Sequence, residues 1–179
     1  MSDKISHYAI PREAFAEPAD VPGPARVMDL WLVRHGEAMQ ASVDPACPLS
    51  AGGIRSISAV ASALSGKMGR LDLVAASGKL RARQTAEILG VAAGYPSDRI
   101  EETRALSPDA TPEMFLAFLE EQRGKENILC VGHLPSIALI ASSLLSAGDS
   151  VRLVFGVGSV CRIRLDSIRR GAGELLLLQ

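Results

Sequence analysis

The sequence predicts an α/β fold, a three-layer α/β/α sandwich with a mainly parallel central sheet. Apolar runs alternate along the chain with segments of helical periodicity, as expected when helices connect parallel strands. Three of the runs are almost wholly apolar, which is typical of strands buried on both faces; they span residues 28–33, 71–76 and 127–131. With 179 residues, the chain is long enough for one such domain with its own core.

The composition indicates a compact globular protein whose net charge does not favour a polyanionic partner. Apolar residues make up 47% of the chain, and the formal net charge is −1, so we expect neither nucleic acid nor membrane as partners. No apolar run reaches the roughly 18 residues of a membrane span. Nor does the N-terminus resemble a secretory signal, so we expect a cytoplasmic protein. Cys47, Cys130 and Cys161 form no zinc pattern and fit small apolar fillers.

Residues 1–26 differ from the rest of the chain and are predicted to form an N-terminal arm or extension. They hold four of the ten prolines and show no apolar periodicity. Residues 27–179 are predicted to form a single catalytic domain.

The first half of this domain reads as two strand–helix units. After the strand at 28–33, Ser50 is suited to cap a helix that ends near 66–69. The strand at 71–76 then leads into a helix over 80–90. The residues expected to face the core from the two helices are Ile54, Ile57, Ala61 and Leu64, then Leu80, Ala82, Thr85, Ala86 and Leu89.

The second half continues the alternation. Thr111 and Pro112 are suited to the cap and first position of a helix that buries Phe115, Phe118 and Leu119. The strand at 127–131 is followed by a helix that begins at Pro135. Three further strands are predicted at 151–155, 159–165 and 174–179, the last after a glycine turn at 171–173.

Chemistry-bearing residues follow three of the predicted strands directly. Arg34 and His35 end the first strand, Ser77 ends the second, and His133 ends the third. Arg81 lies in the first turn of the helix after Ser77. Ligands of open α/β sheets bind outside the carboxyl ends of the strands, so we expect these side chains to share one pocket. Such a cationic cup with an imidazole at its base suits a phosphoryl group.

Each of these residues also has a simpler interpretation. An Arg-His-Gly triplet is short, and His133 taken alone is as consistent with a structural role before a helix as with ligand binding. Arg81 and Arg83 alone would be solvated helix charges, and Glu37 alone a loop carboxylate. The coincidence of all of them after successive strands favours the phosphoryl site.

Four motifs in order carry a resemblance to a known family. They are Leu32-Val33-Arg34-His35-Gly36-Glu37, Leu49-Ser50-Ala51-Gly52-Gly53, Ser77-Gly78-Lys79-Leu80-Arg81-Ala82-Arg83-Gln84-Thr85-Ala86 and Val131-Gly132-His133-Leu134-Pro135. From about residue 30 to 145 the chain resembles the histidine phosphatase superfamily, which includes the cofactor-dependent phosphoglycerate mutases. The resemblance implies a phosphoglycerate mutase-like fold. Because the chain lacks a large lid insertion, it looks most like the SixA-type phosphohistidine phosphatases.

The resemblance also implies residue roles. His35 looks like the nucleophile that takes the phosphoryl group and forms a phosphohistidine enzyme, which water hydrolyses. Arg34, Arg81 and His133 look like the groups that bind its oxygens, so neither a metal nor another cofactor is expected. A nucleophilic imidazole must be neutral, so we expect an acceptor on its other ring nitrogen.

The general acid has no clear position in this sequence. Ala105 stands where many members of the superfamily place a Glu, which leaves Asp44, Glu37 and Glu102 as candidates. We favour Asp44, because SixA-like chains carry an acid near that position. An alkoxide leaving group needs a proton in the transition state, whereas a phosphorylated imidazole ring can itself carry one. The absence of a clearly placed general acid therefore favours a substrate with a P–N bond.

The predicted function is a metal-independent phosphatase that acts on phosphohistidine of a partner protein, such as a histidine phosphotransfer domain. Two alternatives stay open: a phosphatase of a small phosphoester metabolite, and a non-catalytic module that binds a phospho-ligand. A mutase would need a lid that excludes water from the phosphoenzyme, and the loops look too short for one.

Overall fold

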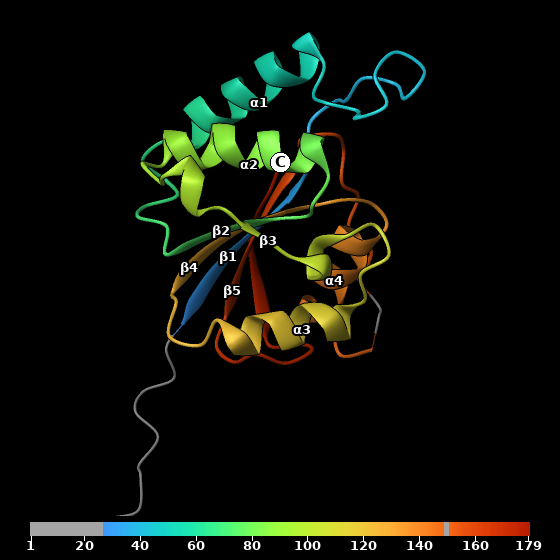
Figure 1. Ribbon diagram of the computed structural model, residues 1–179. Coiled ribbons are helices and arrows are strands. Elements are labelled where there is room, and N and C mark those ends of the chain that lie inside the picture. The colour runs from blue at the N-terminus through green and yellow to red at the C-terminus, as the bar shows by residue number, and fades with distance from the viewer. Residues whose placement is uncertain (1–26, 149–150) are drawn as a thin grey trace, which may run out of the picture.

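A computed structural model describes residues 27–148 and 151–179; the predicted arm over 1–26 lies outside the described residues. The described chain forms one six-stranded sheet in the order β3-β2-β4-β1-β5-β6, with helices on both faces (Figure 1). The strands are β1 (Met28–Arg34), β2 (Leu73–Ala76), β3 (Glu101–Glu102), β4 (Asn127–Gly132), β5 (Val160–Leu165) and β6 (Gly173–Leu178). The α-helices are α1 (Ala51–Leu64), α2 (Leu80–Ala92), α3 (Pro112–Glu121) and α4 (Ser136–Leu145), and two short 3₁₀ segments are η2 (Ser97–Arg99) and η3 (Arg104–Leu106).

The sheet is parallel in the half that carries the candidate site. β3, β2, β4 and β1 pair in parallel, while β5 is antiparallel to β1, and β6 to β5. The predicted α/β fold with a mainly parallel sheet is therefore confirmed, although the last two pairings make the sheet mixed. Because β1, β2 and β4 run in the same direction, their carboxyl ends lie along one edge.

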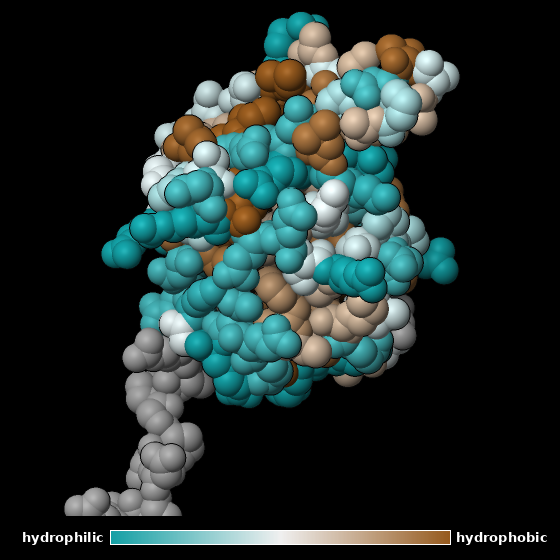
Figure 2. Space-filling view, viewed as in Figure 1, coloured by the Kyte–Doolittle hydropathy of each residue, from teal (hydrophilic) through white to brown (hydrophobic). Residues whose placement is uncertain are grey.

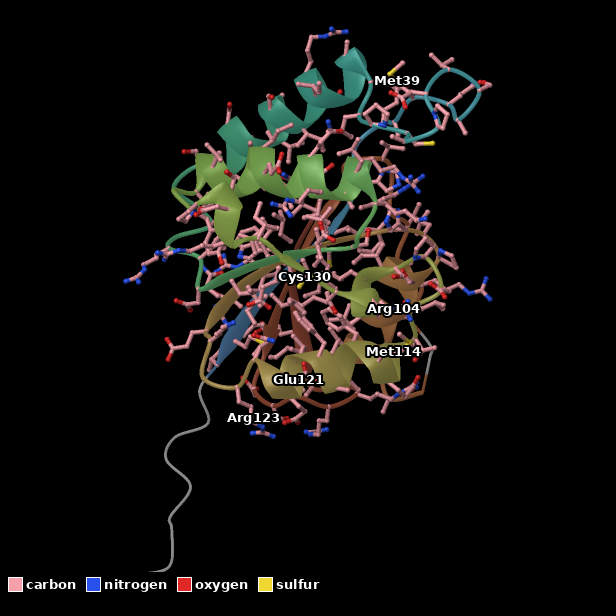
Figure 3. All side chains as sticks on the ribbon, viewed as in Figure 1. Met39, Arg104, Met114, Glu121, Arg123 and Cys130 are labelled. Atoms are coloured by element: carbon pink, nitrogen blue, oxygen red, sulfur yellow. The ribbon has the colours of Figure 1, made fainter. Side chains whose placement is uncertain are left out.

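The central strands are buried on both faces, and successive residues alternate between two cores. In β1, Leu30 and Leu32 pack into the core under α3 and α4, whereas Trp31 and Val33 pack into the core under α1 and α2. Cys130 lies in the middle of the sheet (Figure 3). This two-sided burial is why these strands read as continuous apolar runs in the sequence.

The expected caps start two of the helices. Ser50 Oγ accepts a hydrogen bond from Gly53 N at 2.9 Å, and Thr111 Oγ1 accepts from Met114 N at 3.3 Å, with Pro112 at the first helical position. Each cap satisfies an amide that the helix itself leaves unpaired, which contributes about 1 kcal/mol.

The predicted strand at 151–155 is wrong. Residues 151–155 pair with none of the strands of the sheet. Phe155 still buries its side chain, and its carbonyl serves the candidate site instead. Ile54 and Leu80, both predicted to face the core, are exposed at the starts of α1 and α2.

Three short elements between α2 and α3 were not predicted, because they lack a hydrophobic period. β3 extends the sheet by only two exposed glutamates, which pair with Ala75 and Ala76 at the edge of β2. η3 follows directly and turns the chain back across the carboxyl edge of the sheet.

The surface carries apolar side chains over the α1–α2 layer, which Figure 2 shows as brown patches near the top of the view. Ile54 of α1 and Val91 of α2 are among the exposed hydrophobic residues there. Among the helices in the described part of the chain, none has the length and apolar character to cross a membrane.

Candidate active site

The ends of three parallel strands bring the predicted site residues together. Arg34 is the last residue of β1 and pairs in register with Gly132 of β4, so His35 and His133 leave the sheet side by side. Their ring centroids lie 4.8 Å apart, with the planes tilted by 54°. Ser77 follows β2, and its amide bonds to the Val131 carbonyl at 3.2 Å. The polar side chains therefore converge because the register of the sheet aligns the strand ends.

Two contacts determine which nitrogen of His35 carries the proton. Nδ1 lies 2.7 Å from the carbonyl oxygen of Gly36, which can only accept, so Nδ1 is the protonated nitrogen. Arg81 Nε donates to His35 Nε2 at 3.2 Å, which requires a lone pair on Nε2. Burial, followed by Arg81 and Arg34, lowers the pKa of His35 below its ordinary value of 6.5 despite the opposing Gly36 hydrogen bond. The imidazole is thus neutral at pH 7, with the Nε2 lone pair available to an electrophile.

His133 is held by a buried serine. Its Nε2 lies 2.6 Å from Ser77 Oγ, and both residues are nearly inaccessible, at 2% and 1% exposure. Burial, followed by the charges of His35, Arg81, Lys79 and Arg34, lowers the pKa of His133 to about 3. His133 is therefore a neutral hydrogen-bonding group and not a cation.

The contacts of Ser77 also assign the tautomer of His133. Ser77 Oγ already accepts from Lys79 N at 3.4 Å, and among the described residues its own proton has one acceptor, His133 Nε2. The remaining proton of the neutral ring then lies on Nδ1, which is buried and without a partner in the described part of the chain. A buried donor without a partner is costly, and an anion at the site would satisfy it.

Arg34 and Arg81 reach the same edge from different elements. Arg34 Nη1 donates to the Phe155 carbonyl at 2.9 Å, while its Nε is buried without a partner among the described residues. Arg81 lies in the first turn of α2. Together the two guanidiniums and the two neutral imidazoles form a cup with several donors aimed at one place, which suits a tetrahedral oxyanion.

Comparisons with known proteins agree with this geometry. The sequence matches the model of the histidine phosphatase superfamily (branch 1) over residues 30–107, and it is 27% identical over 147 residues to phosphohistidine phosphatase SixA of Escherichia coli (strain K12). That match covers 80% of this chain and 89% of the relative. The solved structure of the protein histidine phosphatase SixA complexed with tungstate superposes with a TM-score of 0.74 and 26% identity, covering 85% of this chain and 96% of that one.

In sequence and in fold, the chain is similar to the histidine phosphatase superfamily. Within the superfamily it is similar to the SixA type, and this similarity supports phosphatase activity. A phosphoserine phosphatase mutant from Entamoeba histolytica in complex with phosphoserine shares the fold alone, with a TM-score of 0.62 and 16% identity over 84% of this chain and 96% of that one.

A polar residue on the buried face of α2 connects Arg81 to Gly36, the residue that follows His35. Thr85 Oγ1 donates to the Arg81 carbonyl at 2.7 Å and accepts from Gly36 N at 3.1 Å. Sequence reasoning counted Thr85 only as part of the apolar face. The role of Thr85 could have been inferred from its place between Ala82 and Ala86 on that face, because a buried hydroxyl needs hydrogen-bond partners.

The second motif of the superfamily supports the loop after His35. Ser50 Oγ donates to Glu37 Oε2 at 2.5 Å, and Ser50 N donates to the Glu37 carbonyl at 2.9 Å. A Cβ on Gly53 would lie 2.1 Å from that carbonyl oxygen, so only glycine fits there. Gln84 Oε1, which sequence reasoning also missed, accepts from Leu49 N at 2.7 Å.

The general-acid candidates have hydrogen-bond or ion-pair partners other than the paired imidazoles. Asp44 accepts from Ala46 N at 2.9 Å within its own loop, and Glu37 is exposed and bonded to Ser50. In the described residues, no hydrogen bond or ion pair joins either carboxylate to His35, Arg81 or His133. Figure 3 labels Met39 on the same loop, which projects beyond the sheet.

The position where other members carry a Glu is closed to solvent. Ala105 is buried in the core with Leu106, and its amide bonds to Thr103 Oγ1 at 3.2 Å. Glu102, the third candidate, lies nearer the strand ends, with one carboxylate oxygen 3.3 Å from Arg83. The described residues include no cluster of three or more His, Cys, Asp or Glu side chains arranged to hold a metal ion.

Proposed function

We propose that this protein is a phosphohistidine phosphatase that acts on a partner protein, with His35 as the nucleophile. The observation that carries the proposal is the Nε2 lone pair of His35, which faces the place where Arg34, Arg81 and His133 converge. A phosphoryl group bound there has its phosphorus beside the lone pair and its oxygens beside the donors.

The reaction has two balanced steps. The substrate phosphoimidazole takes a proton from solvent on its other ring nitrogen; His35 Nε2 then forms a bond to phosphorus while the P–N bond breaks, and the substrate leaves as neutral imidazole. Water then attacks the phosphoenzyme, releasing phosphate and restoring neutral His35. Arg81, which donates to Nε2 in the free protein, must shift its hydrogen bond to a phosphoryl oxygen as the substrate enters.

Among the described residues, no hydrogen bond or ion pair joins a carboxylate to His35 or His133, and this supports a P–N substrate. The leaving group of a phosphoester is an alkoxide, which needs a positioned proton donor. Asp44 instead accepts a hydrogen bond from Ala46 N, and Glu37 accepts one from Ser50. A phosphoimidazole can be protonated on its own ring before it leaves. If a side chain does protonate the leaving group, Asp44 remains our prediction for that general acid, since the loop that carries it follows the His35 motif.

Three exposed apolar residues next to the candidate site in the sequence support a protein partner. Leu134 adjoins His133, Val154 adjoins Phe155, whose carbonyl holds Arg34, and Val157 adjoins Gly158, whose amide donates to the His35 carbonyl. These three side chains are 39%, 86% and 53% exposed. Exposed apolar side chains next to site residues favour contact with a protein surface over a small, highly charged metabolite.

The similarity to SixA supports the same assignment, because the curated relative is a phosphohistidine phosphatase and the similar solved structure of a protein histidine phosphatase SixA holds tungstate, a tetrahedral oxyanion. Metal independence, a cytoplasmic location and a single catalytic domain over 27–179 complete the proposal. We expect EDTA to leave the rate unchanged, since the guanidiniums supply the positive charge that a metal would supply elsewhere.

The test is a side-by-side comparison of rates. A phosphohistidine-bearing phosphotransfer domain and a panel of small phosphoesters are offered to the wild-type protein, with His35→Ala as the control for spontaneous hydrolysis. We expect the phosphohistidine protein to have the highest kcat/KM. Faster turnover of a phosphoester would make the protein a metabolite phosphatase, and equal turnover by His35→Ala would remove the proposed nucleophile.

A further inference from the structure

A second cavity opens beside the candidate active site. It has a volume of about 290 Å³, and its lining includes Ser77, Lys79, Glu102 and Arg104. Ser77 belongs to both places, because its hydroxyl is also the partner of His133 Nε2 at 2.6 Å. A substrate whose phosphoryl group reaches His133 would therefore have its neighbouring atoms at the entrance to this cavity.

The cavity carries two cations that no other group neutralises. Lys79, at the start of α2, and Arg104, on η3, are both exposed, and neither makes an ion pair within 27–148 or 151–179. Figure 3 labels Arg104 on its short segment beside the sheet. Arg83 on α2, by contrast, is paired with Glu87 and Glu102. Lys79 and Arg104 are thus available to an anion from outside the chain.

The one carboxylate of the cavity is already compensated. Glu102 Oε1 lies 3.3 Å from Arg83 Nη1, so its charge is held from the side of α2. A Cβ on Gly78 would lie 3.5 Å from Glu102 Oε2, so a side chain at position 78 would project into the cavity. Glycine at position 78 therefore leaves the space between Ser77 and Glu102 open.

We propose that this cavity, with Lys79 and Arg104, is a subsite for a carboxylate that the substrate carries close to the transferred phosphoryl group. The inference rests on the proposed phosphatase function and adds a specificity to it. An ammonium and a guanidinium on two different elements suit a carboxylate, because the guanidinium can bind both oxygens while the ammonium acts as a point charge. In a protein substrate the carboxylate would be an Asp or Glu next to the phosphohistidine.

A matched pair of ligands tests the subsite. O-phosphoserine and O-phosphoethanolamine differ by one carboxylate, and their dissociation constants are measured by NMR titration of the His35→Ala protein, in which turnover is removed. We expect phosphoserine to bind about tenfold more tightly, the factor that corresponds to roughly 1.4 kcal/mol. Adding Arg104→Ala should reduce this preference to within about twofold, as expected when one charged partner of a partly exposed pair is lost.

Lys67→Ala is the matched control, because Lys67 is an exposed cation in the turn after α1, away from the strand ends that carry the site. It should leave the preference for phosphoserine intact. An equal loss of preference in Lys67→Ala and Arg104→Ala would overturn the inference, since the effect would then reflect overall charge. So would the absence of any preference in the His35→Ala protein.

A second arm identifies the source of the carboxylate. Phosphohistidine peptides with Asp or Asn directly after the modified residue are compared on the otherwise wild-type protein and on Arg104→Ala. A preference for Asp that Arg104→Ala removes supports a carboxylate from a protein partner, and a preference seen only with phosphoserine supports one from a small molecule. Failure of the proposed function would appear separately, as no turnover of any phosphorylated compound, and would leave the binding comparison valid.

Discussion

Ser77→Ala tests how the structure prepares His133 to bind the phosphoryl group. Ser77 Oγ and His133 Nε2 are 2.6 Å apart, and both side chains are buried. The serine hydroxyl donates to Nε2 and thereby keeps the ring proton on Nδ1, which has no partner among the described residues. Without the hydroxyl, either nitrogen of the neutral ring can carry the proton, and the ring can also rotate.

Two effects of different size follow from this contact. Nε2 of His133 would be left buried without a partner, which lowers the free energy of unfolding by about 1–3 kcal/mol. Loss of a preorganised donor lowers kcat by about 10²–10³. Because the imidazole stays in place and part of its population keeps the right tautomer, we expect a smaller loss in Ser77→Ala, of about tenfold to a hundredfold.

The assay combines kinetics with NMR and uses Ser136→Ala as the matched control. Ser136 is also a buried serine that bonds to the same residue, but its hydroxyl donates to the His133 backbone carbonyl at 2.9 Å and leaves the ring free. We expect both variants to lose stability and Ser77→Ala alone to lose kcat. Two-bond nitrogen–proton correlation spectra of His133 should show the Nδ1–H tautomer in the wild type and a mixture in Ser77→Ala.

Two results would refute this reasoning. An Nε2–H tautomer in the wild-type spectrum would mean that the serine accepts from the ring and that Nδ1 presents a lone pair to the site. Equal kcat values for Ser77→Ala and Ser136→Ala would mean that the hydroxyl only contributes to stability.

Three further predictions concern neighbouring groups. Arg81→Ala should lower kcat by about 10² or more, because it removes one preorganised donor, and unchanged kinetics would exclude Arg81 from phosphoryl binding. The low pKa of His35 predicts that kcat/KM holds from pH 7 down to below 6.5 and falls only as the imidazole is protonated; Arg81→Ala removes a cation that lowers this pKa, so the fall should move to higher pH. Gly53→Ala would place Cβ 2.1 Å from the Glu37 carbonyl and should destabilise the fold by about 1–3 kcal/mol in urea unfolding, whereas Gly52→Ala meets only the flexible end of the Glu37 side chain and should cost less.

The fold was predictable where local pattern and burial agree. The continuous apolar runs of β1, β2 and β4 follow from burial on both faces, and the position of His35 and His133 at one edge follows from parallel pairing. The antiparallel pairing of β5 and β6 could also have been predicted from the length of their connection. Only residues 166–172 join the two strands, whereas a parallel pair needs a crossover of a dozen residues or more.

The remaining features depend on tertiary contacts that no local pattern encodes. Residues 151–155 have the apolar content of a strand, but they join no ladder, and the Phe155 carbonyl instead accepts from Arg34. Likewise, the bond between Ser77 and His133 joins residues 56 apart and depends on the rotamers of both. The sequence predicted that His35, Arg81 and His133 lie together at the strand ends, whereas the hydrogen bonds between their side chains required the coordinates.

The most direct test of the central claim is to trap the phosphoenzyme. The wild-type protein is mixed with a phosphohistidine substrate, quenched within milliseconds at alkaline pH, where phosphohistidine survives, and mapped by mass spectrometry with phosphorus NMR. The structure predicts one phosphoryl group on Nε2 of His35 and none in His35→Ala. Turnover by the wild-type protein with the phosphoryl group found on another residue, or undiminished turnover by His35→Ala, would contradict the account.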